Sequence, residues 1–279
     1  MRFIHPRKTT RRRPPNSKTT SSVDATAFDL VGKAGLGGLT LSDDEKTLYV
    51  VNLYTRKLIA IQIGYPAKTG SSIVAGDITE YSLPSITATG GVARPFALKF
   101  YKGKVYLGVT ATAETSGLAT DLAAYVYQFD HATRTFNTTP VLTAPLNYPK
   151  GKVHASYGTV ANWMSWTSTW SGIQLMGAST VGNRAARPQP MLADLGFTDG
   201  GDMVLGFADR GGHQLGYQQK STVSGDALLY NGYIGGDILR TKKVGSTWVL
   251  ESNGALSGGQ AGCGVGNLQI GRASCRERV

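Results

Sequence analysis

The residues best suited to chemistry stand together in one glycine-rich segment. Asp209, Arg210 and His213 fall within five residues of a 279-residue chain. A carboxylate that holds a guanidinium, or that sets the tautomer of an imidazole, is an arrangement used in acid–base catalysis. Asp and His beside tight turns also bind loop backbone groups, which is a structural role. The segment therefore carries a catalytic and a structural interpretation, and we favour the structural one.

Two more charged residues begin predicted strands. Arg94 opens one, and Asp237 opens another directly after two glycines. If the strands belong to a ring of sheets, their ends meet at a central channel, where ligand sites form. The residues predicted to line such a channel or to bind a ligand there are Arg94, Asp209, Arg210, His213 and Asp237. None of them is assigned as a catalytic residue.

Three tryptophans lie close together in the least regular part of the chain, which is rich in serine and threonine. They are Trp163, Trp166 and Trp170. Exposed aromatic rings among hydroxyl groups form platforms on which sugar rings stack, whereas buried rings fill the space between sheets. Burial is the favoured interpretation. The alternative, a glycan-stacking surface, is the best indication of a binding surface that the sequence offers.

Metal and cofactor chemistry receives no support from residue spacing. The four histidines stand at positions 5, 131, 154 and 213, which is not a metal-ligand pattern. Two acidic segments, 43–45 and 199–202, lack the spaced oxygen ligands of a calcium loop and fit hairpin turns. Cys263 has no nearby histidine and is interpreted as a structural thiol. We therefore predict no metal and no cofactor.

The formal net charge of +11 is concentrated at the two ends of the chain. Residues 1–20 contribute +7 and the last nine residues contribute +2, which leaves +2 for residues 21–270. Basic proteins often bind nucleic acid, but a nearly neutral body makes a nucleic-acid groove on it improbable. Residues 1–28 are predicted to be a basic disordered segment without the apolar core of a secretory signal. No run approaches the ~20 apolar residues of a membrane span.

The regular part of the chain predicts strands joined by short turns. Alternating apolar residues interrupted by turn residues recur three times, and β-branched and aromatic residues are spread along them. The three copies align at Leu39, Leu98 and Leu195, each followed two residues later by another large apolar residue. Third strands are predicted at 56–63 and 122–129, and a fourth strand at 135–141. The pattern indicates an all-β fold.

The spacing of the copies indicates a β-propeller of four-stranded antiparallel blades. The three aligned leucines are separated by 59 and 97 residues. The second interval is close to two repeats of about 50 residues, the range of propeller blades. A divergent blade is therefore predicted between residues 145 and 187. Residues 29–268 are predicted to form a partial propeller of about four to five blades. The alternative is a sandwich or irregular all-β domain.

The last residues suggest a different origin from the rest. The sequence GRASCRERV, at 271–279, reads like the translation of a short-read sequencing adapter. We expect residues 269–279 to be a non-native tail, with native sequence ending near Leu268. Cys275 then belongs to the tail, and Cys263 is left alone.

Three segments carry a resemblance to a known family. They are DLGFTDGGDMVLGFADRGGHQLGY at 194–217, KTLYVVNL at 46–53 and GDILR at 236–240. Together they resemble an uncharacterised β-propeller region of large bacterial surface proteins that carry serine-aspartate-repeat-type B-like domains. The likeness spans roughly residues 28–268. It implies secretion, a multidomain parent chain and further propeller sequence, and it implies no catalytic residues.

Two functions from different classes remain open. The first is a non-enzymatic binding or display module of a secreted or cell-surface bacterial protein, with a glycan or a surface protein as its partner. The second is a propeller hydrolase or lactonase whose site lies in the central channel and uses Arg94, Asp209 and His213. A quinone-dependent dehydrogenase has only the fold in its favour.

Overall fold

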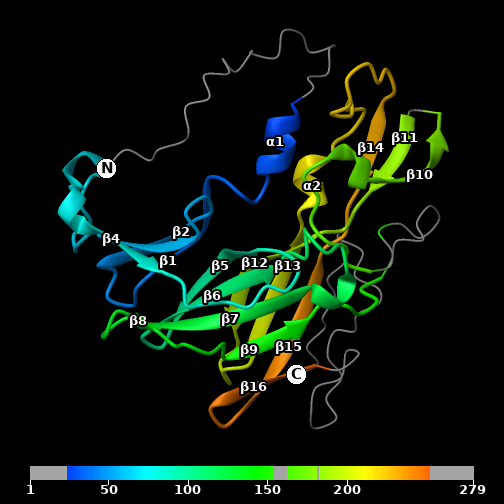
Figure 1. Ribbon diagram of the computed structural model, residues 1–279. Helices are drawn as coiled ribbons and strands as arrows, with labels where there is room; N and C mark the ends of the chain where they lie inside the picture. The colour runs from blue at the N-terminus through cyan, green and yellow to red at the C-terminus, as the bar shows by residue number, and fades with distance from the viewer. Residues whose placement is uncertain (1–23, 152, 154–161, 181, 252–279) are drawn as a thin grey trace.

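The computed structural model describes residues 24–151, 153, 162–180 and 182–251 as an all-β structure with four sheets (Figure 1). Two short α-helices, α1 (Ala25–Leu30) and α2 (Gly211–Gln214), accompany the sheets. No helix in this part of the chain is long and apolar enough to cross a membrane. Residues 1–23 of the predicted basic segment, His154, both cysteines and the predicted tail lie outside the described residues. The last part of the segment predicted to be disordered, residues 25–28, instead begins α1, which Asp24 caps by accepting from the amide of Ala27.

Three of the sheets are antiparallel and run in chain order, as the repeat predicts. The first sheet contains β1 (Leu36–Leu41), β2 (Thr47–Asn52), β3 (Lys57–Gln62) and β4 (Ile78–Ser82). The second contains β5 (Ala93–Tyr101), β6 (Lys104–Ala111), β7 (Ala123–Asp130), β8 (Thr135–Phe136) and β9 (Leu142–Pro145). The third contains β12 (Pro190–Phe197), β13 (Met203–Asp209), β15 (Asp237–Val244) and β16 (Thr247–Leu250).

A small mixed sheet and four short turns of 3-10 helix complete the described structure. The small mixed sheet consists of β10 (Gln174–Ser179), β11 (Gly182–Ala186) and β14 (Tyr230–Tyr233), and β11 pairs with β14 in parallel. The 3-10 turns are Gly70–Ser72, Ala75–Asp77, Ala119–Asp121 and Trp170–Gly172. The small mixed sheet lies beside α1 and α2 at one end of the molecule (Figure 1).

The three aligned leucines occupy the same place in their hairpins, which confirms the sequence repeat. Leu39 faces Val50, Leu98 faces Leu107 and Leu195 faces Leu205 across the first hairpin of each sheet. The first strand of each sheet also carries a register shift shortly before the aligned leucine. Such bulges bend a strand and increase its twist. The three sheets are therefore copies of one structural unit.

The predicted fourth strand and the predicted divergent blade differ from the structure. The segment at 135–141 is interrupted, and two separate strands, β8 and β9, pair with β7 instead. Pro140 lies between them and has no N–H group for a continuous ladder. Among the described residues of 145–187, β10 and β11 form only a hairpin, and its partner β14 comes from beyond α2. Two four-stranded units and one five-stranded unit are thus described, and a closed ring is not.

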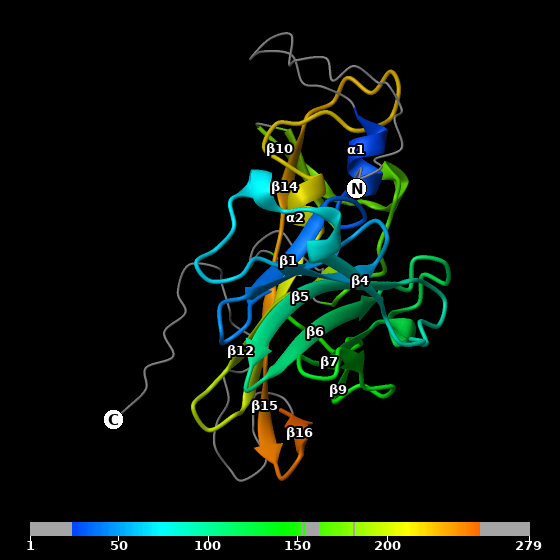
Figure 2. The same ribbon diagram turned by 90° about the vertical axis from the view of Figure 1, so that its left-hand side faces the viewer.

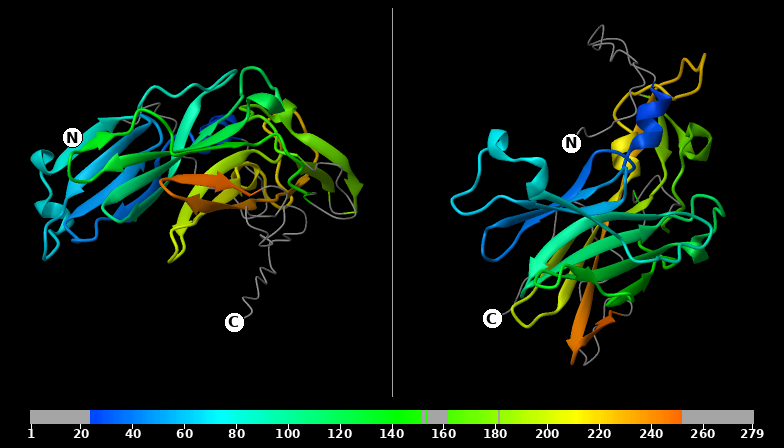
Figure 3. Two further views of the ribbon diagram at one scale, coloured as in Figure 1. Left: turned by 90° about the horizontal axis from the view of Figure 1, so that it is seen from below. Right: turned by 60° about the vertical axis from the view of Figure 1, so that its left-hand side comes forward.

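The first strands of the three sheets, which we call the inner strands, lie side by side. β5 lies between β1 and β12 (Figure 2). The three sheets follow one another when the molecule is viewed from below (Figure 3). One apolar core forms between the first and second sheets and another between the second and third.

Small residues allow the inner strands to approach so closely. A Cβ atom at Gly38 of β1 would lie 2.7 Å from the carbonyl oxygen of Phe96 and 2.8 Å from the amide nitrogen of Leu98, both on β5. A Cβ at Gly108 of β6 would lie 2.7 Å from a methyl carbon of Leu192 on β12. A side chain at either position fits only if neighbouring atoms move, and at Gly38 those atoms belong to the backbone of β5.

We predict that Gly38→Ala lowers the free energy of unfolding by about 1–3 kcal/mol, because the added methyl group must push β1 away from β5. Urea unfolding followed by tryptophan fluorescence measures the change. The matched control is Gly70→Ala, where a Cβ meets no atom within 4 Å, and where the change should stay within about 0.5 kcal/mol. Equal effects at the two positions would show that the close approach of the strands is not limiting.

Candidate functional site

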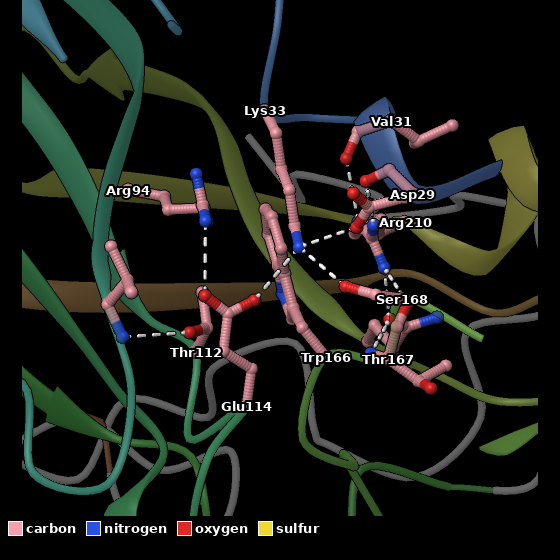
Figure 4. A network of polar contacts seen from close by, with 12 residues as sticks. Asp29, Val31, Lys33, Arg94, Thr112, Glu114, Trp166, Thr167, Ser168 and Arg210 are labelled. Atoms are coloured by element: carbon pink, nitrogen blue, oxygen red, sulfur yellow. Dashed lines mark hydrogen bonds and ion pairs between the residues drawn. The ribbon is translucent and has the colours of Figure 1, made fainter. Parts of the chain in front are cut away.

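A buried polar network surrounds Trp166, where α1, the segment that follows β6 and the end of β13 meet (Figure 4). The guanidinium carbon of Arg210 lies 4.6 Å from the centre of the indole ring and that of Arg94 lies 5.7 Å from it. The indole N–H donates to the carbonyl of Pro190 at 2.7 Å. Trp166 thus brings together two of the predicted channel residues, Arg94 and Arg210.

Arg210 is fully buried and uses its guanidinium to tie distant segments together. It donates to the backbone carbonyls of Asp29 at 2.9 Å, Val31 at 2.8 Å and Thr167 at 2.7 Å, and to the side-chain oxygen of Gln189 at 2.6 Å. Burial lowers the pKa of Arg210 to about 10, which leaves it charged at neutral pH. The guanidinium therefore fixes the end of α1 against β13 and against residues 162–172, which contain the three tryptophans and which we call the tryptophan loop.

Arg94 belongs to a chain of ion pairs on the other side of Trp166. Its guanidinium pairs with one oxygen of Glu114 at 3.1 Å, and Lys33 pairs with the other oxygen at 3.2 Å. Lys33 also pairs with Asp29 at 2.9 Å and donates to the Ser168 hydroxyl at 2.7 Å. Glu114 and Lys33 carried no signal in the sequence, because only the tertiary fold brings them to Arg94.

The Asp209 side chain is buried, and its carboxylate accepts hydrogen bonds from backbone amides. One carboxylate oxygen accepts from the amides of Gln189 at 2.9 Å and Gly211 at 2.8 Å, and the other accepts from the amide of Gly235 at 3.2 Å. Burial raises the pKa of this carboxyl to about 6, against the opposing effect of the three hydrogen bonds. Among the described residues, neither a hydrogen bond nor an ion pair links Asp209 to Arg210 or His213, and His213 lies exposed on α2.

A second group of buried polar residues surrounds Asp237 at the start of β15. The Tyr148 hydroxyl donates to Asp237 at 2.6 Å, and the Trp163 indole N–H lies 3.3 Å from the same hydroxyl. Lys150 donates to the carbonyl of Gly235 at 2.8 Å, and its ammonium lies 4.5 Å from the centre of the Trp163 ring. Burial raises the pKa of Asp237 and lowers the pKa of Lys150.

Sequence reasoning missed Lys150 in this group. It stands between Pro149 and Gly151, a context typical of a surface turn, and only the fold places it beside Asp237. A buried lysine and carboxylates with shifted pKa values are features of functional sites, although structural ion networks share them.

All three predicted stacking tryptophans are buried. Trp163, Trp166 and Trp170 are 1%, 3% and 7% exposed. Trp170 packs against Tyr230 and Phe28, with ring centres 4.8 and 6.0 Å apart. Because a sugar ring needs an open aromatic face, the structure gives these three rings the space-filling role and offers no stacking platform at them.

No group of three or more histidine, cysteine, aspartate or glutamate side chains that could hold a metal ion occurs in the described ranges. His131 is instead hydrogen-bonded to the Tyr49 hydroxyl at 2.7 Å, between the first and second sheets.

A hollow of about 410 Å³ lies on the surface where the first sheet leads into the second. Arg56 stands on its wall in an exposed turn. The neighbouring Lys57 is already paired with Glu80 at 2.9 Å. The volume is within the range of small-ligand sites. The lining residues are Thr55, Arg56, Lys57, Ser82, Leu83, Pro84, Ile86, Ala88, Gly91, Val92 and Ala93.

The fold and these sites define an all-β repeat protein in which buried charged residues such as Arg210, Asp209 and Asp237 bind backbone groups or neighbouring polar side chains at the ends of strands. No protein-family model matches the chain. Colossin-A of Dictyostelium discoideum is 30% identical to it over 230 residues, which make up 81% of this chain and 2% of that protein. The chain therefore spans a very small part of the relative that it matches.

Among solved structures, xylan β-1,4-xylosidase from Bacillus halodurans C-125 is similar with a TM-score of 0.30 and 14% identity. The match covers 80% of this chain and 34% of the xylosidase chain. At this level of similarity neither the fold nor the function of the chain follows from the match.

We predict that the Asp209 carboxyl makes stability fall as the pH rises from about 4 to about 6. At pH 5 the folded protein holds this proton, whereas the unfolded chain, with an ordinary pKa of 3.8, has released it. The difference amounts to at most about 3 kcal/mol. Urea unfolding of the natural protein and of Asp209→Asn, at pH 4, 5, 6 and 7, measures it.

The stability advantage of the natural protein over Asp209→Asn should shrink across this range, because the variant has no proton to release at this position. An advantage that grows with pH would mean that the three backbone hydrogen bonds outweigh burial and hold the carboxylate charged.

We predict that Arg210→Lys lowers the free energy of unfolding by about 3 kcal/mol, because an ammonium cannot reach the carbonyls that the guanidinium joins and leaves some of them unpaired. Thermal and urea unfolding measure the loss. The matched control is Arg56→Lys in an exposed turn, which should be nearly neutral. A neutral Arg210→Lys would show that the tie between α1 and β13 contributes little.

Proposed function

We propose that this chain is a section of a β-propeller and serves as a non-enzymatic binding or display module in a much larger secreted or cell-surface protein. The parent would be a bacterial surface protein of the kind that the sequence resembles. The observation that carries the proposal is the side-by-side arrangement of the three inner strands, each the first strand of an equivalent antiparallel sheet of four or five strands.

This arrangement supports a propeller over a sandwich. In a sandwich, two sheets pack face to face and the chain alternates between them. Here the first and second sheets are each built from consecutive strands, the third is interrupted only by β14 of the small mixed sheet, and each of the three packs on its neighbour in chain order. Radial repetition of four-stranded sheets is the design of propellers.

The bonding of the charged residues supports binding over catalysis. Arg210 and Asp209 form their hydrogen bonds with backbone groups and with Gln189, and Arg94 is paired with Glu114. Residues used in this way stabilise the junctions of the sheets and are not directed at a substrate. The similarity to 2% of Colossin-A supports a small module in a long chain.

The hollow between the first two sheets is the binding place that we propose. Arg56 makes no ion pair with any described residue, so its guanidinium is open to an acidic or hydroxyl-rich ligand. Guanidinium groups recognise carboxylates through paired hydrogen bonds. A glycan with acidic sugars is the partner with this chemistry, and a surface protein with an acidic loop is the other outcome that the experiment must distinguish.

One observation favours the alternative of a hydrolase or lactonase. Lys150, Asp237 and Asp209 are buried near one another, and their pKa values are shifted toward neutrality by burial. Acid–base catalysts have shifted values of this kind. The group competes with the binding proposal only if the chain turns over a substrate.

We predict that the 279-residue chain binds acidic glycans on a glycan array and that Arg56→Asn weakens the binding about tenfold or more. Arg56 has a positive φ of 55°, which asparagine tolerates. The matched control is Lys102→Asn, at a φ of 49° in a turn that does not line the hollow, and its binding should be unchanged.

Capture of surface proteins only, again sensitive to Arg56→Asn, would assign a protein partner to the hollow. Binding to neither class would refute the binding function. Hydrolysis of an aryl glycoside or a lactone that is lost in Asp237→Asn would favour the enzyme.

A further inference from the structure

The inner strand of the first sheet exposes a row of leucines. Leu36, Leu39 and Leu41 of β1 are 58%, 67% and 39% exposed, and the pairing of β1 with β2 places all three on the same face of the sheet. We call this surface the outward face of β1. Isolated exposed leucines are ordinary, but a contiguous apolar row on a strand points to an interaction surface.

Three equivalent residues of the other two inner strands are buried, and the fourth, Phe197 of β12, is half-buried. Leu98 and Phe100 of β5, which align with Leu39 and Leu41, are 5% and 8% exposed. In β12, Leu195 is 1% exposed. The difference between the strands is not a matter of residue type, because all these side chains are large and apolar. It arises from what lies in front of them.

The buried residues of β5 and the buried Leu195 of β12 are each covered by the sheet that precedes their own in the chain. Leu98 and Phe100 belong to the core that contains residues from the opposite face of the first sheet, namely Tyr49, Val51, Leu58 and Ala60. Leu195 belongs to the core that contains residues from the opposite face of the second sheet, namely Tyr106, Ala124, Val126, Leu142 and Ala144. Each cover is thus one face of an antiparallel sheet with aromatic, valine and alanine side chains.

We propose that a further four-stranded antiparallel sheet of the same repeat, supplied by the parent chain, docks on the outward face of β1 as the first sheet docks on β5. The inference rests on the proposed propeller and is independent of the binding function. Val50 and Ile59, deeper on the same face, are already buried at 6% and 2% exposed. The docking sheet therefore chiefly covers the inner strand.

The first experiment tests whether the outward face is free in the 279-residue chain. The double variant Leu39→Lys with Leu41→Lys should keep the urea midpoint of the natural protein and bind less of an apolar dye such as ANS. Leu98→Lys is the matched control at the equivalent buried position, and it should unfold the protein or lower the midpoint strongly. A double variant as destabilised as Leu98→Lys would overturn the proposal, because the face would already be covered.

The second experiment supplies the missing sheet. A second copy of residues 34–92, the first sheet with its natural connection, is joined by a flexible glycine-serine linker to the N-terminus of residues 24–279. Leu39→Cys in the original copy, with Cys263→Ser and Cys275→Ser, introduces a thiol whose rate of reaction with maleimide is measured. A short flexible linker holds the added sheet at a millimolar effective concentration.

Labelling of the thiol at position 39 should be rapid without the added sheet and slower by about tenfold or more with it. Val51→Asp in the added copy alone should restore rapid labelling, because it removes the apolar face that docks. Equal rapid labelling with and without the added sheet would overturn the proposal.

Two other outcomes would also overturn it. Slow labelling of the unfused chain at every concentration would show that another part of the same chain covers the face. Slow labelling only at high concentration would show that a second copy of the protein does. None of these rates depends on Arg56 or on a glycan, so failure of the binding function is distinguishable from failure of this docking.

Discussion

The close approach of the three inner strands is the constraint on which the rest of the structure depends. Inner strands of neighbouring sheets can meet only where side chains are absent or very small. Gly38 of β1 provides that space for β5, and on the neighbouring strand β6 of the second sheet Gly108 admits the Leu192 side chain from β12. Threonine hydroxyls join the sheets at the same places, since Thr40 accepts from the amide of Phe100 and Thr110 accepts from the amide of Leu192, each at 3.0 Å. Glycine and threonine therefore set the order and the spacing of the sheets.

A buried charged side chain, that of Arg210, holds together the segments that lie beside the inner strands. An uncompensated buried guanidinium is very costly, so it persists only where the surrounding groups satisfy it. Arg210 meets this condition with three backbone carbonyls and a glutamine oxygen taken from α1, the tryptophan loop and the segment before β12. None of these segments belongs to a regular ladder at that point. The arginine gives them a common partner, and Trp166 lies flat between it and Arg94.

The sequence predicted the repeated hairpins well and the site poorly, for one physical reason. Strand alternation and turn chemistry are local, so the alignment of Leu39, Leu98 and Leu195 could be predicted without any knowledge of tertiary contacts. The grouping of Asp209, Arg210 and His213 was also local, but successive residues at a strand end point in different directions. Apart from Gln189, which contacts both Asp209 and Arg210, their partners consequently lie in different segments. Lys33, Glu114 and Lys150 reach the junctions from distant parts of the chain, and no spacing rule connects them.

The predictions of a fourth strand at 135–141 and of a blade after residue 145 were wrong, because a prediction from repeat spacing assumes that every repeat unit is complete. In the second sheet two short strands, β8 and β9, take the place of a single fourth strand. The chain then departs from the repeat and forms the tryptophan loop and the hairpin of β10 and β11. That departure has a consequence for packing. Trp163 belongs to the core between the second and third sheets, and Trp166 lies at the junction of α1 with that region. A segment that breaks the repeat thus supplies large side chains that fill space beside two of its copies, which is why Trp163 and Trp166 are buried although the sequence around them looked irregular.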